Sequence, residues 1–248
     1  MSQISSFPAE CNVAIIGASG GIGGAMLRLL SDDSRVANIH ALSRSATDAS
    51  LPKVTAGSID LDDEHSIATA AQRAAQNDAL DLVIVTSGIL WEGEDLRPEK
   101  SMRELDMQRL TRLFAVNAAG PALVAKHFLP QMRKQSKTLF ASLSARVGSI
   151  GDNRLGGWYS YRASKAALNM LLKTLAIEHA RQWPDSVVAG LHPGTVNTAL
   201  SQPYTSRTPK ESLFSPETSA QHLLNVMNQL RPEDSGGVFA WDGSRIQY

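Results

Sequence analysis

The stretch that decides the fold is Asn12-Val13-Ala14-Ile15-Ile16-Gly17-Ala18-Ser19-Gly20-Gly21-Ile22-Gly23. Its nearly unbroken apolar start is typical of a strand buried on both faces. Glycines follow at once, and residues 21–30 then predict a helix. Glycines permit a tight turn, and a helix N-terminus offers unpaired N–H groups to a phosphate. The sequence therefore predicts a phosphate-binding loop made by Gly17, Ser19, Gly20, Gly21, Ile22 and Gly23.

The rest of the chain alternates between β-rich apolar runs and longer helical stretches. Strands are expected over residues 12–16, 36–42, 54–59, 80–85, 138–143, 187–191 and 238–241. Helices are expected over residues 21–30, 62–76, 102–132, 158–182 and 216–230, the last capped by Ser215 with Pro216 in its first turn. The alternation predicts an α/β fold, a single doubly wound Rossmann-type sheet of seven parallel strands with helices on both faces.

Residues 1–10 are expected to form a flexible N-terminus and residues 11–248 a single domain. Residues 201–214 are polar and punctuated by proline, which is typical of a loop that closes over a substrate. The 248-residue chain has a net charge of zero, so neither nucleic acid nor an anionic membrane is an expected partner. Cys11 is the only cysteine and the six histidines lack ligand spacing, so we expect no metal site and a cytoplasmic location.

A second motif, Tyr161-Arg162-Ala163-Ser164-Lys165, is read together with the glycine loop. Tyr161 and Lys165 are four apart, so on a helix they lie one turn apart on the same face. A nearby ammonium favours the phenolate and is expected to lower the pKa of Tyr161. Such a tyrosine can exchange a proton with an alcohol or a carbonyl. The two motifs together indicate a hydride-transfer enzyme.

The glycine loop also matches the pattern G-x-S-x-G, with Ser19 in the place of a nucleophile. This would indicate a serine hydrolase. In α/β-hydrolases that serine follows several earlier strands, whereas here it follows the first one. The sequence therefore favours the phosphate-binding interpretation.

In this order the motifs resemble those of the short-chain dehydrogenase/reductase family. They are Gly17-x-x-x-Gly21-x-Gly23, Val116-Asn117-Ala118-Ala119-Gly120, a serine after residues 138–143, Tyr161-x-x-x-Lys165 and Pro193-Gly194-x-Val196-x-Thr198. The segment 148–162 resembles the C-factor/sniffer-like carbonyl reductase subgroup. The likeness implies a small-molecule carbonyl or alcohol substrate, and a homodimer or homotetramer joined through the helices that carry Asn117 and Tyr161.

The resemblance also implies roles for single residues. Tyr161 would be the general acid in reduction and the base in oxidation, and Lys165 would lower its pKa and bind the nicotinamide ribose. Asn117 would lie at a helix irregularity and hold a water that relays protons. The implied cofactor contacts beyond the glycine loop are Ser43, Arg44, Asp60, Leu61, Ser87, Gly88, Asn117, Tyr161, Lys165, Pro193, Gly194, Val196 and Thr198.

Two stretches depart from the family pattern. The family has Ser-Ser-x-x-Gly after the fifth strand, whereas this chain has Ser144-Ala145-Arg146-Val147-Gly148, which puts Ala145 in the catalytic slot. A shift of one residue would restore Ser144, which we favour; Ser149 or no serine is the alternative. The family's Asn-Asn-Ala-Gly appears here as Val85-Thr86-Ser87-Gly88, and Thr86 is expected to substitute structurally.

The end of the second strand bears on the choice of cofactor. It reads Ala41-Leu42-Ser43-Arg44 and has no carboxylate that would bind a ribose 2′-hydroxyl. Arg44 could pair with a 2′-phosphate, which favours NADP(H), with NAD(H) possible and a merely solvated Arg44 as the alternative. Leu90, Trp91, Trp158 and the loop 201–214 are the candidate walls of the substrate site.

A different class of protein is also compatible with these motifs. An NADP(H)-binding sensor or signalling protein with little turnover would need the glycine loop, and the C-factor resemblance permits it. The intact set of Tyr161, Lys165 and Asn117 argues against it, because binding alone does not require a tuned phenol.

Overall fold

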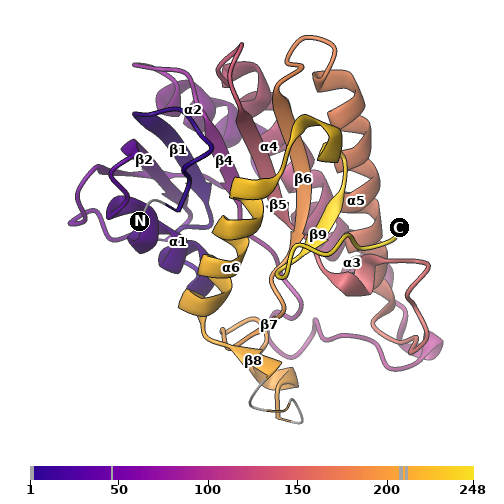
Figure 1. The fold of residues 1–248 in the computed structure, drawn as a ribbon. Coiled ribbons are helices and arrows are strands. Elements are labelled where there is room, and N and C mark those ends of the chain that lie inside the picture. The colour runs from indigo at the N-terminus through magenta and orange to yellow at the C-terminus, as the bar shows by residue number, and fades with distance from the viewer. Residues whose placement is uncertain (1–2, 46, 207–208, 210–211) are drawn as a thin grey trace.

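A seven-stranded parallel sheet runs through the middle of the molecule (Figure 1). The computed structural model describes residues 3–45, 47–206, 209 and 212–248. The strands are β1 (Cys11–Ile16), β2 (Val36–Ser43), β3 (Val54–Ser58), β4 (Leu82–Val85), β5 (Thr138–Leu143), β6 (Ser186–His192) and β9 (Val238–Ala240). Their order is β3-β2-β1-β4-β5-β6-β9, and every neighbouring pair is parallel. This confirms the predicted doubly wound sheet, whose order reverses between β1 and β4, the place where such sheets bind ligands.

Helices cover both faces of the sheet (Figure 1). The helices α1 (Gly21–Ser31) and α6 (Pro216–Gln229) pack on one face, and α2 (Glu64–Ala74), α4 (Gly120–Phe128) and α5 (Tyr159–His179) pack on the other. Successive strand residues point to opposite faces, so Ile15 joins one apolar core while Ile16 joins the other. Ser215 caps α6 and Pro216 begins it, as the sequence predicts. Among the described residues, no helix is long and apolar enough to cross a bilayer.

The single helix predicted over residues 102–132 is wrong, because this stretch is broken into pieces. A 3-10 turn at Met102–Glu104 precedes α3 (Met107–Phe114), which Asp106 caps through the backbone N–H groups of residues 108 and 109. A π-helical segment, Ala115–Ala119, then joins α3 to α4, and a 3-10 turn at Leu129–Gln131 ends the stretch. The π segment contains Asn117, so the helix irregularity implied for this residue is present.

Two further segments differ from the sequence expectations. Ile4 and Phe7 are buried in the core beside α1 and α6, although a flexible segment is predicted over residues 1–10, of which 1–2 lie outside the described residues. A short parallel pair is formed by β7 (Thr195–Val196), which precedes the loop predicted over residues 201–214, and β8 (Leu213–Phe214), which is the end of that loop. Within that loop, residues 207–208 and 210–211 lie outside the described part of the chain.

Candidate active site

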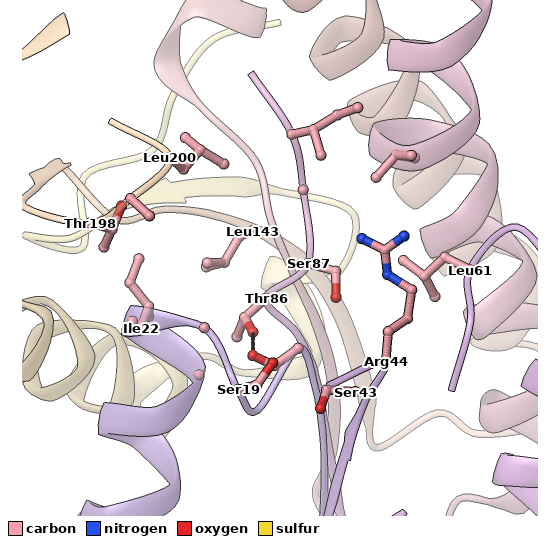
Figure 2. Close-up of a pocket in the computed structure, with 18 of the residues that line it drawn as sticks. Ser19, Ile22, Ser43, Arg44, Leu61, Thr86, Ser87, Leu143, Thr198 and Leu200 are labelled. Atoms are coloured by element: carbon pink, nitrogen blue, oxygen red, sulfur yellow. Dashed lines mark hydrogen bonds between the residues drawn. The ribbon is translucent and has the colours of Figure 1, made fainter. Parts of the chain in front are cut away.

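A cavity of about 400 Å³ opens at the carboxyl ends of the central strands (Figure 2). Arg44 and Leu61 lie toward one end of it, and Ile22, Thr198 and Leu200 lie toward the other (Figure 2). The residues predicted from the sequence that line this cavity are Gly17, Ser19, Gly20, Gly21, Ile22, Gly23, Ser43, Arg44, Asp60, Leu61, Ser87, Gly88, Ser144, Tyr161, Lys165, Pro193 and Thr198. Segments far apart in the sequence are thus brought to one site.

The glycine loop between β1 and α1 has room only for glycine at positions 17 and 23. Gly17 adopts a φ of +89°, and a Cβ there would lie 2.6 Å from Thr86 Oγ1. A Cβ at Gly23 would lie 2.3 Å from the carbonyl oxygen of Gly17. No side chain caps α1 at Gly20, and its first turn contains no acidic residue. The N-terminus of α1 therefore suits a phosphate in shape and in polarity.

The end of the cavity beside β2 and β3 has a positively charged side chain, that of Arg44. Ser43, Arg44, Asp60 and Leu61 follow these two strands and line the cavity together. Within the described residues, no carboxylate forms a salt bridge with Arg44. The guanidinium is therefore available to an anionic group of a ligand.

Thr86 holds the middle of the cavity together. Its hydroxyl donates to the carbonyl oxygen of Ile16 at 2.9 Å and to that of Gly17 at 3.1 Å. These contacts tie the end of β4 to the end of β1, so Thr86 has the structural role that the sequence predicts. Gly88, two residues on, allows a close approach, since a Cβ there would lie 3.2 Å from Asn117 Oδ1.

Asn117 is fully buried in the π segment and does not itself line the cavity. Its Oδ1 accepts from the backbone N–H of Ile89 at 2.9 Å, and its Nδ2 donates to the carbonyl oxygen of Ile89 at 2.8 Å. Nδ2 also lies 3.2 Å from Ser164 Oγ on α5. The amide thus joins the segment after β4 to the helix that carries Tyr161.

Tyr161 and Lys165 both face the cavity from the first turns of α5. Lys165 Nζ donates to the carbonyl oxygen of Leu143 at 2.8 Å and lies 5.9 Å from the centroid of the Tyr161 ring. Burial raises the pKa of Tyr161 to about 12 and lowers the pKa of Lys165 to about 8. The pKa of Tyr161 is thus raised and not lowered as predicted, because burial disfavours the charged phenolate. At neutral pH the phenol holds its proton and can donate it.

The serine that we favour from the sequence has another partner. Ser144 lines the cavity, but its hydroxyl donates to Asn169 Oδ1 at 2.6 Å. Asn169 follows Tyr161 by eight residues, which places it about 12 Å further along α5. Ala145 instead packs in the same apolar cluster as Tyr161. Ser149 accepts from the backbone N–H of Asp152 at 3.1 Å in a local turn.

Of the four residues expected at the nicotinamide, two do not line the cavity and instead pack behind the residues that do. Pro193 and Thr198 line it, whereas Gly194 and Val196 do not. Gly194 has a φ of +79°, and a Cβ there would lie 2.7 Å from the Phe214 ring. Val196 is buried in β7, where it pairs with Phe214.

An apolar cluster packs around Tyr161 at the edge of the cavity. The Trp158 ring lies edge-on to Tyr161 at 6.1 Å and to Tyr204 at 5.3 Å between centroids. Trp91 Nε1 donates to the carbonyl oxygen of Leu200 at 2.9 Å, which joins two segments of the cluster. Its members are Ile89, Leu90, Trp91, Leu96, Leu113, Ala145, Val147, Trp158, Tyr161, Leu200 and Tyr204. The candidate walls predicted from the sequence therefore meet beside Tyr161.

Sequence reasoning missed several lining residues. They are Ser45, Ile59, Asp62, Ile89, Val116, Leu143, Ala199 and Leu200. Most are chain neighbours of predicted residues, and proximity to a strand end is the signal that could have found them. In the described part of the chain, no group of three or more His, Cys, Asp or Glu side chains could hold a metal ion.

Comparison with known proteins agrees with this geometry. A family model described as short chain dehydrogenase matches residues 11–209. The chain belongs to the short-chain dehydrogenase family. This short-chain dehydrogenase is accordingly an oxidoreductase of the class that uses a nicotinamide cofactor.

The relatives of this short-chain dehydrogenase extend the comparison. It is 30% identical to 1-hydroxy-2-glutathionyl-2-methyl-3-butene dehydrogenase of Rhodococcus sp. (strain AD45), over 95% of this chain and 99% of the relative. It is 32% identical to C-signal of Myxococcus xanthus, over 60% of this chain and 84% of the relative. The crystal structure of an NADPH-bound carbonyl reductase from chicken fatty liver has a TM-score of 0.83 at 23% identity, covering 98% and 97% of the two chains. At this identity, the similarity to the chicken carbonyl reductase shows a shared fold.

Proposed function

We propose that this short-chain dehydrogenase is an NADP(H)-dependent oxidoreductase that interconverts a small carbonyl compound and its alcohol, with Tyr161 as the general acid or base. The observation that carries the proposal is the joint placement of Tyr161, Lys165 and the glycine loop around one cavity. A dinucleotide that has its phosphates on the loop can extend along this cavity toward the phenol. Binding alone would not require a proton donor there.

The residues of the chain then have separate tasks. The glycine loop would hold the diphosphate, Asp60 would contact the adenine end, and Lys165 would contact the nicotinamide ribose. Bound NADPH supplies the hydride. Tyr161, protonated at neutral pH, donates its proton to the carbonyl oxygen during reduction and accepts one during oxidation. Asn117 keeps the segment after β4 against α5 and so fixes one side of the site.

The end of β2 supports NADP(H) over NAD(H). Arg44 lines the cavity and forms no salt bridge with a carboxylate of the described residues, so it can pair with a 2′-phosphate. The residues directly after Leu42 are Ser43 and Arg44, so no carboxylate is present at the end of β2 to bind a 2′-hydroxyl. The similar carbonyl reductase from chicken fatty liver has NADPH bound, which agrees with this preference.

The apolar cluster beside Tyr161 bears on the substrate. Trp91, Trp158 and Tyr204 belong to this cluster together with aliphatic side chains. Such surroundings favour a neutral, apolar carbonyl compound over a charged one, because burying an unpaired charge is costly. We therefore expect an uncharged ketone or aldehyde.

We further propose a homodimer or homotetramer in the cytoplasm. Met107 and Phe114 on α3, and Met170 and Ile177 on α5, are exposed apolar side chains. Each pair is seven residues apart, which places its members on one face of their helix. These helices adjoin the π segment with Asn117 and carry Tyr161, as the family resemblance implies for a subunit contact.

The test is a titration with NADPH and with NADH, followed by energy transfer from the tryptophans, together with turnover of a carbonyl panel. We expect tighter binding of NADPH, and turnover that Tyr161→Phe lowers about 10²- to 10⁴-fold while the Kd of NADPH changes less than threefold. Binding of NADPH without turnover of any carbonyl would favour a sensor. No binding of either cofactor to the folded protein would contradict the proposal.

A further inference from the structure

Glu99 is a buried carboxylate outside the cavity, at the start of the helix that carries Tyr161. It is 1% exposed and lies in the irregular segment between β4 and α3. Its Oε2 accepts from the backbone N–H of Ser160 at 3.2 Å, and its Oε1 accepts from the hydroxyl of Ser160. Within the described residues, no cationic side chain forms a salt bridge with Glu99. Both carboxylate oxygens are thus committed to the residue that precedes Tyr161.

The helix α5 has no cap of its own. Its N-cap residue is Trp158, which has a φ of +52° and makes no side-chain capping bond. Gly156 and Gly157 before it have φ values of +62° and +63°, so the chain enters α5 through three left-handed residues in a row. Trp158 is a residue type that rarely adopts this conformation, so something outside the helix must hold it there. The N–H groups of the first turn likewise need an acceptor from elsewhere.

Glu99 meets both requirements. Its carboxylate provides an acceptor for the first turn, where a negative charge also complements the helix dipole. Its backbone carbonyl accepts from the N–H of Trp158 at 2.5 Å. Trp158 in turn packs edge-on against the Tyr161 ring at 6.1 Å between centroids. Glu99 therefore holds both Ser160, which precedes Tyr161, and the backbone of Trp158, whose ring packs against Tyr161.

We propose that Glu99 is a positioning residue that caps α5 from a distant segment and thereby fixes the Tyr161 phenol for proton transfer. The activity part of this inference rests on the proposed function. A shift of about 1 Å in a reacting group can cost about 100-fold in rate, so loosening the first turn of α5 should be visible in kcat. The glycine loop and Arg44 lie on other elements, and Lys165 lies one turn further along α5 and is held by the carbonyl oxygen of Leu143, so we expect the Kd of NADPH to stay within threefold.

The experiment compares Glu99→Ala, Glu99→Gln and Ser160→Ala with the matched control Glu94→Ala. Glu94 belongs to the same segment, but its side chain is 93% exposed and forms a salt bridge with Arg97 at 3.6 Å. We expect Glu99→Ala to lower kcat at least tenfold, with the Kd of NADPH within threefold of wild type. Glu99→Gln should keep kcat within threefold of wild type, because its amide oxygen still accepts a hydrogen bond. Glu94→Ala should match wild type. Unchanged kcat in Glu99→Ala would overturn the proposal.

Hydrogen exchange of the peptide 158–165 gives a readout that does not depend on turnover. We expect at least tenfold faster exchange of the first-turn amides in Glu99→Ala, an intermediate effect in Ser160→Ala, and no change in Glu94→Ala. If Glu99→Ala does not fold, Ser160→Ala and Glu99→Gln decide by the same measurements. If the wild type turns over no carbonyl, the proposed function fails, and unchanged exchange in Glu99→Ala would then separately overturn the role of Glu99.

Discussion

At Ser144 and Ala145 the position of one hydroxyl group bears on how the proposed carbonyl substrate would be held. A serine hydroxyl has a single proton to donate, and that of Ser144 is donated to Asn169. In this arrangement it has none left for a carbonyl oxygen beside Tyr161. Of these two residues, Ala145 is the one in the apolar cluster of Tyr161. Under the proposed function, the phenol would then be the main polar group at the reacting oxygen.

This arrangement predicts opposite outcomes for two substitutions. Ala145→Ser adds a donor beside Tyr161, and we expect it to raise kcat/KM about threefold to tenfold, or about 1 kcal/mol. Ser144→Ala leaves the buried Asn169 short of a partner, so we expect lower stability, by about 1–3 kcal/mol, and less than a threefold change in kcat/KM. Steady-state kinetics and urea unfolding measure the two effects. A tenfold loss of kcat/KM in Ser144→Ala, with Ala145→Ser inert, would return the catalytic role to Ser144.

The charge at Arg44 predicts a change of cofactor. Replacing Arg44 by Asp removes a charge-assisted contact and puts a carboxylate where a 2′-phosphate would lie. We expect the ratio of the Kd values for NADPH and NADH to shift by about 100-fold toward NADH, or about 3 kcal/mol. Arg28→Asp is the control, because Arg28 already pairs with Glu217 at 2.8 Å. An unchanged ratio in Arg44→Asp would exclude Arg44 as the selector.

At the scale of elements, the strands and the phosphate loop could be predicted because their signals are local. Apolar runs of strand length lie between helical stretches, and the run of residues 138–143 coincides with β5. The pair β7–β8 was missed, because two-residue strands have no periodicity. The long helix was predicted as continuous, because apolar spacing carries on through the π and 3-10 turns. Glu99 was missed, because its contact with Ser160 spans 61 residues.

The tight junction of β1 and α1 predicts unequal effects at two adjacent glycines. A methyl group at Gly23 would lie 2.3 Å from the carbonyl oxygen of Gly17, so the loop or the helix must move. We expect Gly23→Ala to weaken NADPH binding at least 100-fold. Gly24→Ala is the matched control, because its methyl group would meet nothing closer than 3.4 Å, and we expect less than a threefold change. Fluorescence titration measures both, with circular dichroism to check folding. Equal Kd values would contradict the close approach.

At the scale of the whole molecule, two half-buried or buried histidines make stability depend on pH. Burial lowers the pKa of His179, and mainly burial that of His192, each to about 4. His179 is stacked on Trp183 at 4.7 Å between ring centroids, and its Nε2 lies 3.1 Å from Ser186 Oγ. The unfolded chain binds more protons than the folded one between pH 6.5 and about 4, so stability is complete above pH 6.5 and is lost as the pH falls.

We therefore expect the free energy of unfolding to decrease by about 2 kcal/mol or more between pH 7 and pH 4.5. His179→Gln should remove part of this dependence, because the amide cannot take up a proton. His65→Gln is a control, since His65 is exposed. Urea unfolding at several pH values measures the slope. A slope that is the same in His179→Gln and in wild type would exclude His179 as a source.

The π segment Ala115–Ala119 also sets how α4 is rotated about its axis relative to α3. Each residue turns an α-helix by about 100°. Deleting one residue here to make the helix regular would therefore rotate α4 by that angle. Val124, Ala125 and Phe128, all buried against the sheet, would then swing away from it. The packing of α4 on the sheet therefore requires the extra residue of the π segment. This requirement also keeps Asn117 pointing inward, independently of the chemistry at the cavity.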